Sequence, residues 1–277
     1  MQRLRNSWAL TKASWAVLMA DKELLAFPII SFFASALVLL TFMVPMLLSG
    51  LFDAVLGIPF MGTIIMFLFY LVLYTVTIFC NAAIVGAAHI RLKGGDPTIS
   101  DGLSIAWQNI GPILGYAAIS ATVGVILRAI SERSGTLGRI VISLVGAGWN
   151  IVTFLVVPVL VIEGIGPVDG IKRSFELLKT TWGEQIAGNM GLGFVFGLFY
   201  VLVGVLSVPL FILGIVLNAL PLIAVGAVVM LLGFSLVGLV QASMQGIYTA
   251  AVYQYATTGQ AGEFFDPEVV KHAFKQK

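Results

Sequence analysis

The sequence has few charged residues and a single cysteine. Asp, Glu, Lys and Arg make up only 10% of the 277 residues, whereas apolar residues make up 59%. Soluble domains carry about a quarter charged residues and under half apolar ones. The net charge of +2 is too small to indicate nucleic-acid binding. Because no soluble domain could bury this much apolar surface, lipid must be the solvent for most of the chain.

The lone cysteine, Cys80, lies inside an apolar run. With no second thiol in the chain, an intramolecular disulfide is excluded, and nothing follows about the redox compartment. A buried single thiol behaves as a small apolar side chain rather than as a nucleophile. We therefore expect Cys80 to be a packing residue.

Long uncharged runs give the number of membrane spans. A helix needs about 20 apolar residues to cross the hydrocarbon core. The last run, 185–262, is 78 residues long and holds a cluster of Gly, Asn and Pro at 214–221, so it accounts for two spans. We predict one all-α integral membrane domain over 1–262 and a short polar cytoplasmic tail at 263–277. Its six transmembrane helices are expected at about 25–50, 60–89, 111–128, 139–162, 186–213 and 221–256.

The first uncharged run also bears on processing and orientation. It is 29 residues long, against about 7–15 for the apolar region of a cleavable signal peptide, so we expect it to remain as an anchor. Twelve basic residues fall on one side of the predicted spans, and only Arg128, Arg133 and Arg139 fall on the other. Basic residues concentrate in cytoplasmic loops. This bias predicts a multi-pass protein of the cell (inner) membrane with both termini in the cytoplasm.

The segments before the odd-numbered spans resemble one another. Residues 5–12 align with 172–179 at an offset of 167, and Asp101-Gly102 of the middle segment matches Asp169-Gly170. In each segment the residues at i, i+4, i+7 and i+11, all apolar except Thr11, form the stripe of an amphipathic helix. The pattern predicts elbow helices at about 3–22, 98–110 and 168–184, each lying at the cytoplasmic surface before a transmembrane hairpin. Their expected interfacial anchors are Trp8, Trp15, Trp107, Phe175 and Trp182.

The predicted fold is therefore three transmembrane hairpins of the same orientation, each preceded by one elbow helix. The alternative is that the aromatic stripes pack on the protein's own loops. The elbow pattern, basic–Ser–aromatic–x–Leu–x–Lys, follows a Gly/Pro turn at 163–170, and a second such turn, 94–97, precedes Thr98. In this the chain resembles uncharacterised bacterial and archaeal six-helix membrane proteins. It is also similar to the membrane domain fused to some glycerophosphodiester phosphodiesterases. The resemblance implies a fold and no catalytic residues. We expect no counterpart of the soluble catalytic domain, because the sequence holds no long polar segment.

Residues that could carry chemistry are scarce. The six predicted spans hold no Asp, Glu or Lys, which weighs against a proton relay, a salt-bridge gate or an intramembrane carboxylate catalyst. The two histidines, His89 and His272, have no cysteine near them, and neither a Gly-x-Ser-x-Gly nor a Walker pattern occurs. We therefore predict no catalytic residue, no metal site and no cofactor, and we expect that the protein is not an enzyme.

Uncharged polar residues within the spans are the remaining candidates. Two interpretations stay open. Amides in lipid form hydrogen bonds between helices, so they could tie the spans together. They could also line a polar cavity that opens to the cytoplasm and holds a headgroup or a small solute. The candidates for either role are Asn81, Asn150, Asn189, Gln241, Gln245 and Tyr248.

Small residues recur at helical spacing. Gly111–Gly115 and Gly193–Gly197 match GxxxG, and Gly238, Ala242 and Gly246 repeat every four residues. Such seams let helices approach closely, within one molecule or between copies. The sequence thus favours a non-enzymatic membrane protein: a scaffold, assembly factor or membrane-organising partner. The alternative is a transporter or channel for a lipid or an uncharged solute. The expected partners are membrane lipid and either a second copy or another membrane protein, with no nucleic acid.

Overall fold

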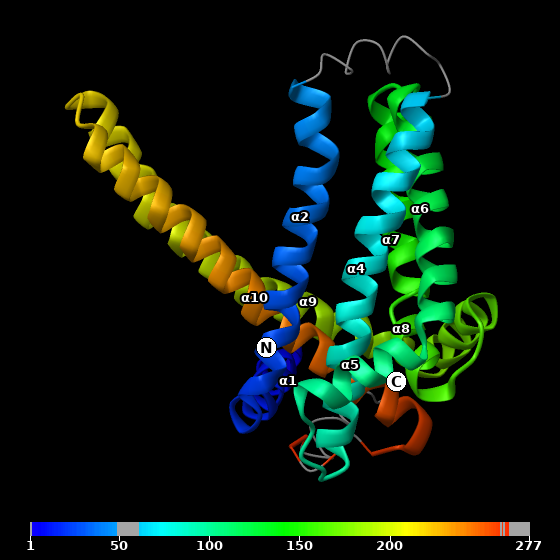
Figure 1. Cartoon of the computed structure of the whole chain (residues 1–277). Helices are drawn as coiled ribbons and strands as arrows, with labels where there is room; N and C mark the ends of the chain where they lie inside the picture. Colours follow the sequence, from blue (N-terminus) through cyan, green and yellow to red (C-terminus); the bar gives the residue numbers. More distant parts are fainter. Residues whose placement is uncertain (1, 49–60, 261, 263, 266–277) are drawn as a thin grey trace.

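In the computed structural model, which describes residues 2–48, 61–260, 262 and 264–265, every regular element is a helix (Figure 1). The first half of the chain forms α1 (Gln2–Ala20), the 3₁₀ turn η1 (Lys22–Leu25), α2 (Ala26–Leu48), α4 (Met61–Leu92), α5 (Ile99–Gln108) and α6 (Ile110–Glu132). The second half forms α7 (Thr136–Val152), α8 (Val156–Pro158), the π-helical turn η2 (Val159–Glu163), α9 (Pro167–Val216) and α10 (Leu220–Thr258).

Six stretches of these helices are long and apolar enough to cross a membrane. They are Lys22–Leu47, Met61–Leu92, Ile110–Glu132, Thr136–Glu163, Leu192–Val216 and Leu220–Thr258. The prediction of a six-span, all-helical, multi-pass membrane protein is therefore confirmed. Most of the predicted tail, 263–277, lies outside the described residues.

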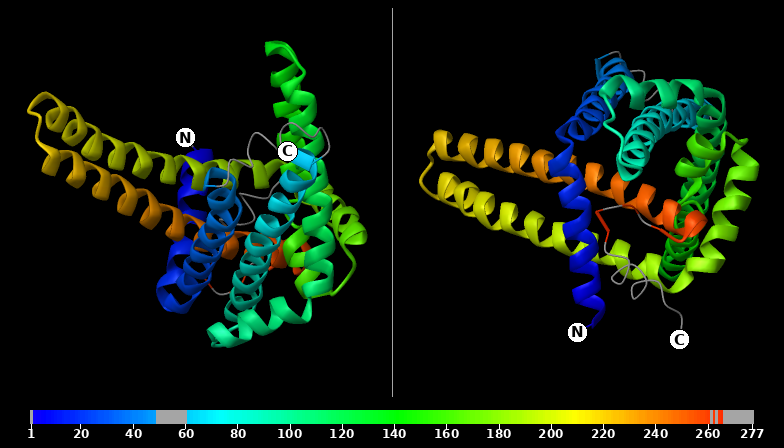
Figure 2. Two further views of the ribbon diagram at one scale, coloured as in Figure 1. Left: turned by 45° about the horizontal axis from the view of Figure 1, so that its top comes forward. Right: turned by 90° about the horizontal axis from the view of Figure 1, so that it is seen from below.

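The spans do not form one closed bundle. Figure 1 shows α2, α4, α6 and α7 running roughly side by side, whereas α9 and α10 pair as a hairpin that leaves the others at an angle. The view from below in Figure 2 shows α1 crossing both helices of this hairpin near its base. Along the rest of its length the hairpin turns many large apolar side chains outward, among them Val201, Leu206 and Leu231.

The tightly packed part of the molecule lies at the end that carries α1, α5 and the last turns of α10 (Figure 1). Its centre is formed by residues 82–88 of α4 and 246–253 of α10, nearly all fully buried. Small side chains make this possible. A Cβ on Gly246 would lie 2.4 Å from Ile84 Cγ2, and one on Gly102 of α5 would lie 2.4 Å from Phe27 Cζ. Close helix approach through small residues therefore holds this end together.

Two of the three segments predicted as elbow helices form separate helices, α1 and α5, and the third is the first part of α9. A capping box starts α5: the Thr98 hydroxyl accepts from Asp101 N, and the Asp101 carboxylate accepts from Thr98 N. The hydrogen bonds that the Asp101 carboxylate accepts from Thr98 N and from the Thr98 hydroxyl hold the pKa of this carboxyl below its usual value. In the third segment no break separates elbow from span, because α9 is one helix whose first and last parts run in different directions (Figure 2).

The fourth span differs from the unbroken helix expected at 139–162. Regular α-helix stops at Val152, and a turn over 153–155 precedes α8 and η2. Pro158 accounts for the break, because proline has no N–H to donate to the carbonyl of Phe154 and its ring crowds that carbonyl. The Thr153 hydroxyl adds to the effect by donating to the carbonyl of Trp149 at 2.8 Å, a bond that bends helices.

Candidate functional site

The break in the fourth span is held by a serine from the third elbow segment. Ser174 of α9 is fully buried, and its hydroxyl donates to the carbonyl of Val152 at 2.6 Å. The same oxygen accepts a hydrogen bond from Leu155 N at 3.2 Å. Backbone groups freed by a helix break at membrane depth need replacement partners. Ser174 thus satisfies one group on each side of the break and fixes α9 against the fourth span.

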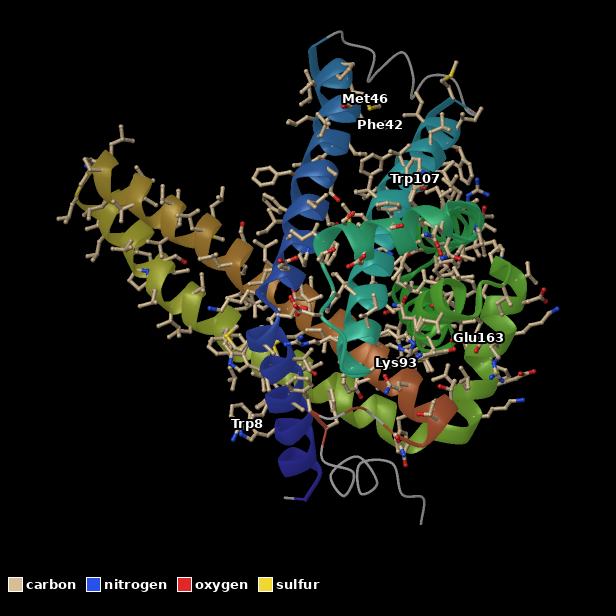
Figure 3. The ribbon with its side chains drawn as sticks, turned by 60° about the horizontal axis from the view of Figure 1, so that its bottom comes forward. Trp8, Phe42, Met46, Lys93, Trp107 and Glu163 are labelled. Atoms are coloured by element: carbon tan, nitrogen blue, oxygen red, sulfur yellow. The ribbon has the colours of Figure 1, made fainter. Side chains whose placement is uncertain are left out.

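A polar cluster follows where the fourth span ends. Glu163 is the last residue of the π-helical turn η2, and its Oε1 accepts from Arg173 Nε at 3.1 Å and from the Tyr253 hydroxyl at 3.0 Å. The ring of His89, from α4, lies 6.4 Å from that of Tyr253 in an edge-to-face contact. Figure 3 shows Glu163 at the same end of the molecule as Lys93. The cluster links the second, fourth and sixth spans to the start of α9.

A second group of charges joins α1 to α4. Arg91 forms an ion pair with Asp96 at 3.0 Å and donates to the carbonyl of Ala20, the last residue of α1. Asp21 follows in the chain and is buried, and its burial raises the pKa of this carboxyl while the charge of Arg91 opposes the rise. The backbone N–H of Ile99 donates to the Glu23 carboxylate at 3.0 Å and so fixes the start of α5. These charged side chains therefore hold α1, α4 and α5 together.

Within the part of the chain that the structure describes, no group of three or more His, Cys, Asp or Glu side chains could hold a metal ion. The carboxylate of Glu163 is occupied by an arginine and a tyrosine, an arrangement that fixes helices. Cys80 is buried, as expected.

The predicted amides whose side chains are described lie on α4, α7 and α10. Gln241 of α10 accepts a hydrogen bond from the Tyr200 hydroxyl of α9 at 2.9 Å, which is a bond between helices. Asn81 is half-buried beside Gly246, and Asn150 is exposed on α7. The side chain of Asn189 lies outside the described residues.

The last two predicted polar residues lie on one turn of α10. The carbonyl of Gln245 accepts from the Thr249 hydroxyl, a bond within the helix, and the Gln245 side chain is half-buried. Tyr248 is buried with its ring 6.2 Å from that of Phe154. Gln241 is thus hydrogen-bonded between two helices, and the choice between the two predicted roles for the other polar residues stays a prediction.

The predicted anchors are exposed wherever their side chains are described. Trp8 and Trp107 are 60% and 68% exposed, and Trp15 and Phe175 are 44% and 37% exposed. Trp107 also packs edge-to-face on Phe79, and the Lys179 ammonium lies 4.4 Å above the Phe175 ring. The side chain of Trp182 lies outside the described residues. Their location at headgroup depth stays a prediction.

Two apolar grooves flank the α9–α10 hairpin, and sequence reasoning did not find either. The α1 groove, about 510 Å³, lies between α1 and the base of the hairpin. The α2 crevice, about 730 Å³, lies where α10 diverges from α2 and α4. Neither is lined by any of the predicted amides. The α2 crevice is lined by Ser31, Ser35 and Ala36 of α2 and by Ser235, Gly238 and Ala242 of α10, together with larger apolar side chains.

One side of the hairpin combines this crevice with a row of glycines. Gly193, Gly197 and Gly204 of α9 share a helix face with Tyr200, at i, i+4, i+11 and i+7. A Cβ on any of these glycines would meet no described atom within 4 Å. The Tyr200 ring stacks on Phe234, which borders the α2 crevice, so the glycines and the crevice are neighbours. We call this surface, made of Gly193, Gly197, Gly204, Ser235, Gly238 and Ala242, the small-residue face.

Comparison with known proteins gives a family and no activity. Residues 60–264 match the model of a family of unknown function (DUF6159), so the chain belongs to that family. A search of the curated proteins finds no match.

Proposed function

We propose that this chain is a non-enzymatic membrane scaffold that assembles with a second copy of itself through the small-residue face of the α9–α10 hairpin. One observation carries the proposal: the outer part of the hairpin stands away from the other four spans, and a Cβ added to Gly193, Gly197 or Gly204 would meet no described atom within 4 Å. In lipid, helices associate by close packing of small residues and not by the hydrophobic effect.

The experiment that tests this proposal compares two open glycines. Replacing Gly197 on the small-residue face with leucine should weaken self-association about tenfold or more, because the longer side chain holds a second helix away. Gly148 on α7 also has no described atom within 4 Å of an added Cβ, so Gly148→Leu is the matched control and should leave association unchanged. The particle mass of each variant in detergent, measured across a dilution series, gives its degree of self-association. Equal masses for the wild type and both variants would exclude this face as the contact.

A second candidate is a transporter for a lipid or an uncharged solute, the class favoured by the serines in the α2 crevice. Ser31, Ser35 and Ser235 offer hydroxyl groups at the crevice wall to a molecule that enters sideways from the bilayer. A wild-type protein that stays a single copy at all concentrations and carries a lipid displaced by Ser35→Leu would favour this second candidate.

We also propose the finer arrangement that the sequence indicates. Each hairpin is preceded by an elbow helix in the cytoplasmic headgroup layer, and both termini are cytoplasmic in the inner membrane. The exposure of Trp8, Trp107 and Phe175 supports this proposal. So does the common end of the molecule at which α1, α5 and the start of α9 lie (Figure 1).

Orientation can be tested with single cysteines, because Cys80 is the only native one and a Cys80→Ser background is free of thiols. Gly135, in the turn between α6 and α7, and Lys93, after α4, are both exposed. In intact cells an impermeant maleimide should label Gly135→Cys and should reach Lys93→Cys only after lysis. The reverse pattern would contradict the basic-residue bias from which the orientation was inferred.

A further inference from the structure

The α1 groove has the chemistry of an amphiphile site. Its walls are apolar side chains of the hairpin, among them Phe196, Phe199 and Val240, and its rim is formed by α1. On α1, Trp8, Thr11 and Trp15 lie on one face, at i, i+3 and i+7, with Lys12 beside them. The volume of about 510 Å³ lies within the range of sites that hold small organic ligands.

Among the described residues, Lys12 supplies the only charge in this lining. The side chain is exposed, and no carboxylate of the described residues lies within ion-pair distance of it. By contrast, Lys172 pairs with Asp169, and Arg173 pairs with Glu163. A lone cation at the mouth of an apolar groove is complementary to a ligand with an anionic head and an apolar tail.

The position of the α1 groove relative to the membrane indicates that the amphiphile is a membrane lipid. Figure 3 shows Trp8 on α1, on the same side of the molecule as the α9–α10 hairpin. Val195 and Leu236 lie within two apolar spans, so the inner part of the groove is at acyl-chain depth. Trp side chains prefer the headgroup level, and basic residues beside them attract anionic lipid.

We propose that the α1 groove binds one anionic phospholipid, with its phosphate at Lys12 between Trp8 and Trp15 and one acyl chain along Phe196, Phe199 and Val240. This site is distinct from the small-residue face, and it goes beyond the proposed assembly function. The bound lipid ties α1 to the base of the hairpin, because it contacts α1, α9 and α10 together.

The two rim tryptophans provide the signal for a test. Replacing Trp107, Trp149 and Trp182 with phenylalanine leaves Trp8 and Trp15 as the only indoles. Bromine on an acyl chain quenches indole emission on contact. In mixed micelles, brominated phosphatidylglycerol should quench this reference protein with about fivefold higher apparent affinity than brominated phosphatidylcholine, as one lysine near the surface predicts.

Two lysine substitutions distinguish binding in the α1 groove from general attraction of anionic lipid to the basic surface. Lys12→Gln should abolish the preference for phosphatidylglycerol. Lys22→Gln is the control, because Lys22 is also exposed and follows α1 but does not line the groove, and it should keep the preference. Equal quenching by both lipids, or equal losses in the two variants, would overturn the proposal.

The proposed position of the acyl chain is tested by filling the inner part of the α1 groove with a larger side chain. Val240→Phe should reduce quenching by both brominated lipids, since the added ring occupies the place of the chain. Leu236→Phe, at an exposed position, should also reduce quenching by both lipids and replaces Val240→Phe if that variant does not fold. Circular dichroism and size-exclusion chromatography report whether each variant is folded. Unchanged quenching in a folded variant would place the lipid elsewhere. Self-association is measured separately, so a failure here leaves the assembly proposal standing.

Discussion

Replacing Ser174 with alanine should destabilise the protein by about 2–4 kcal/mol. The hydroxyl donates to Val152 O and accepts from Leu155 N, and both backbone groups lie at a buried helix break. A buried polar group left without a partner costs about 1–3 kcal/mol. We expect the apparent Tm in detergent to fall by several degrees and the contact between α9 and the fourth span to loosen.

Ser207→Ala is the matched control for this prediction. Ser207 is also fully buried, but its hydroxyl donates to Val203 O within its own helix, where the carbonyl keeps its ordinary backbone partner. Its loss should change stability by less than about 0.5 kcal/mol. If the two variants have the same Tm, Ser174 does not stabilise the break in the fourth span.

Replacing Gly102 with alanine should cost about 2–3 kcal/mol, the upper part of the range for overpacking. The new Cβ would lie 2.4 Å from Phe27 Cζ and 2.8 Å from the backbone oxygen of Ala83. The ring could rotate away, but the backbone of α4 cannot move without disturbing the buried stretch around it. The helix α5 should therefore shift away from α2 and α4.

Gly111→Ala, at the start of α6, provides the comparison. No described atom lies within 4 Å of an added Cβ there, so the change should be neutral or should stabilise the helix by up to about 1 kcal/mol. Thermal melting of both variants in the same detergent reports the difference. A Gly102→Ala protein as stable as Gly111→Ala would mean that α5 does not pack as closely as described.

The number of spans could be predicted from the sequence because it depends on local composition. Runs of about 20 uncharged residues specify a crossing whatever surrounds them. The capping box at Thr98 that starts α5 is local in the same way, because it is formed by two residues three positions apart. The break in the fourth span had a signal that went unused, Pro158 inside an apolar run.

The candidate site depends on contacts between residues far apart in the sequence. Ser174 was part of the predicted elbow motif, but its role arises only when α9 meets the break 19 residues earlier. The bond between Tyr200 and Gln241 and the divergence of the hairpin from α2 are likewise results of packing. Small-residue spacing indicated that helices could approach there, but it could not show which glycines meet a neighbour and which stay open.

Cross-linking in native membranes tests the central claim most directly, because it needs no extraction into detergent. In a Cys80→Ser background, single cysteines are placed on the small-residue face by Gly197→Cys and on α7 by Gly148→Cys. The scaffold account predicts that mild oxidation produces a covalent dimer from Gly197→Cys and little from Gly148→Cys. No dimer from Gly197→Cys, or equal dimer from both variants, would contradict assembly through this face.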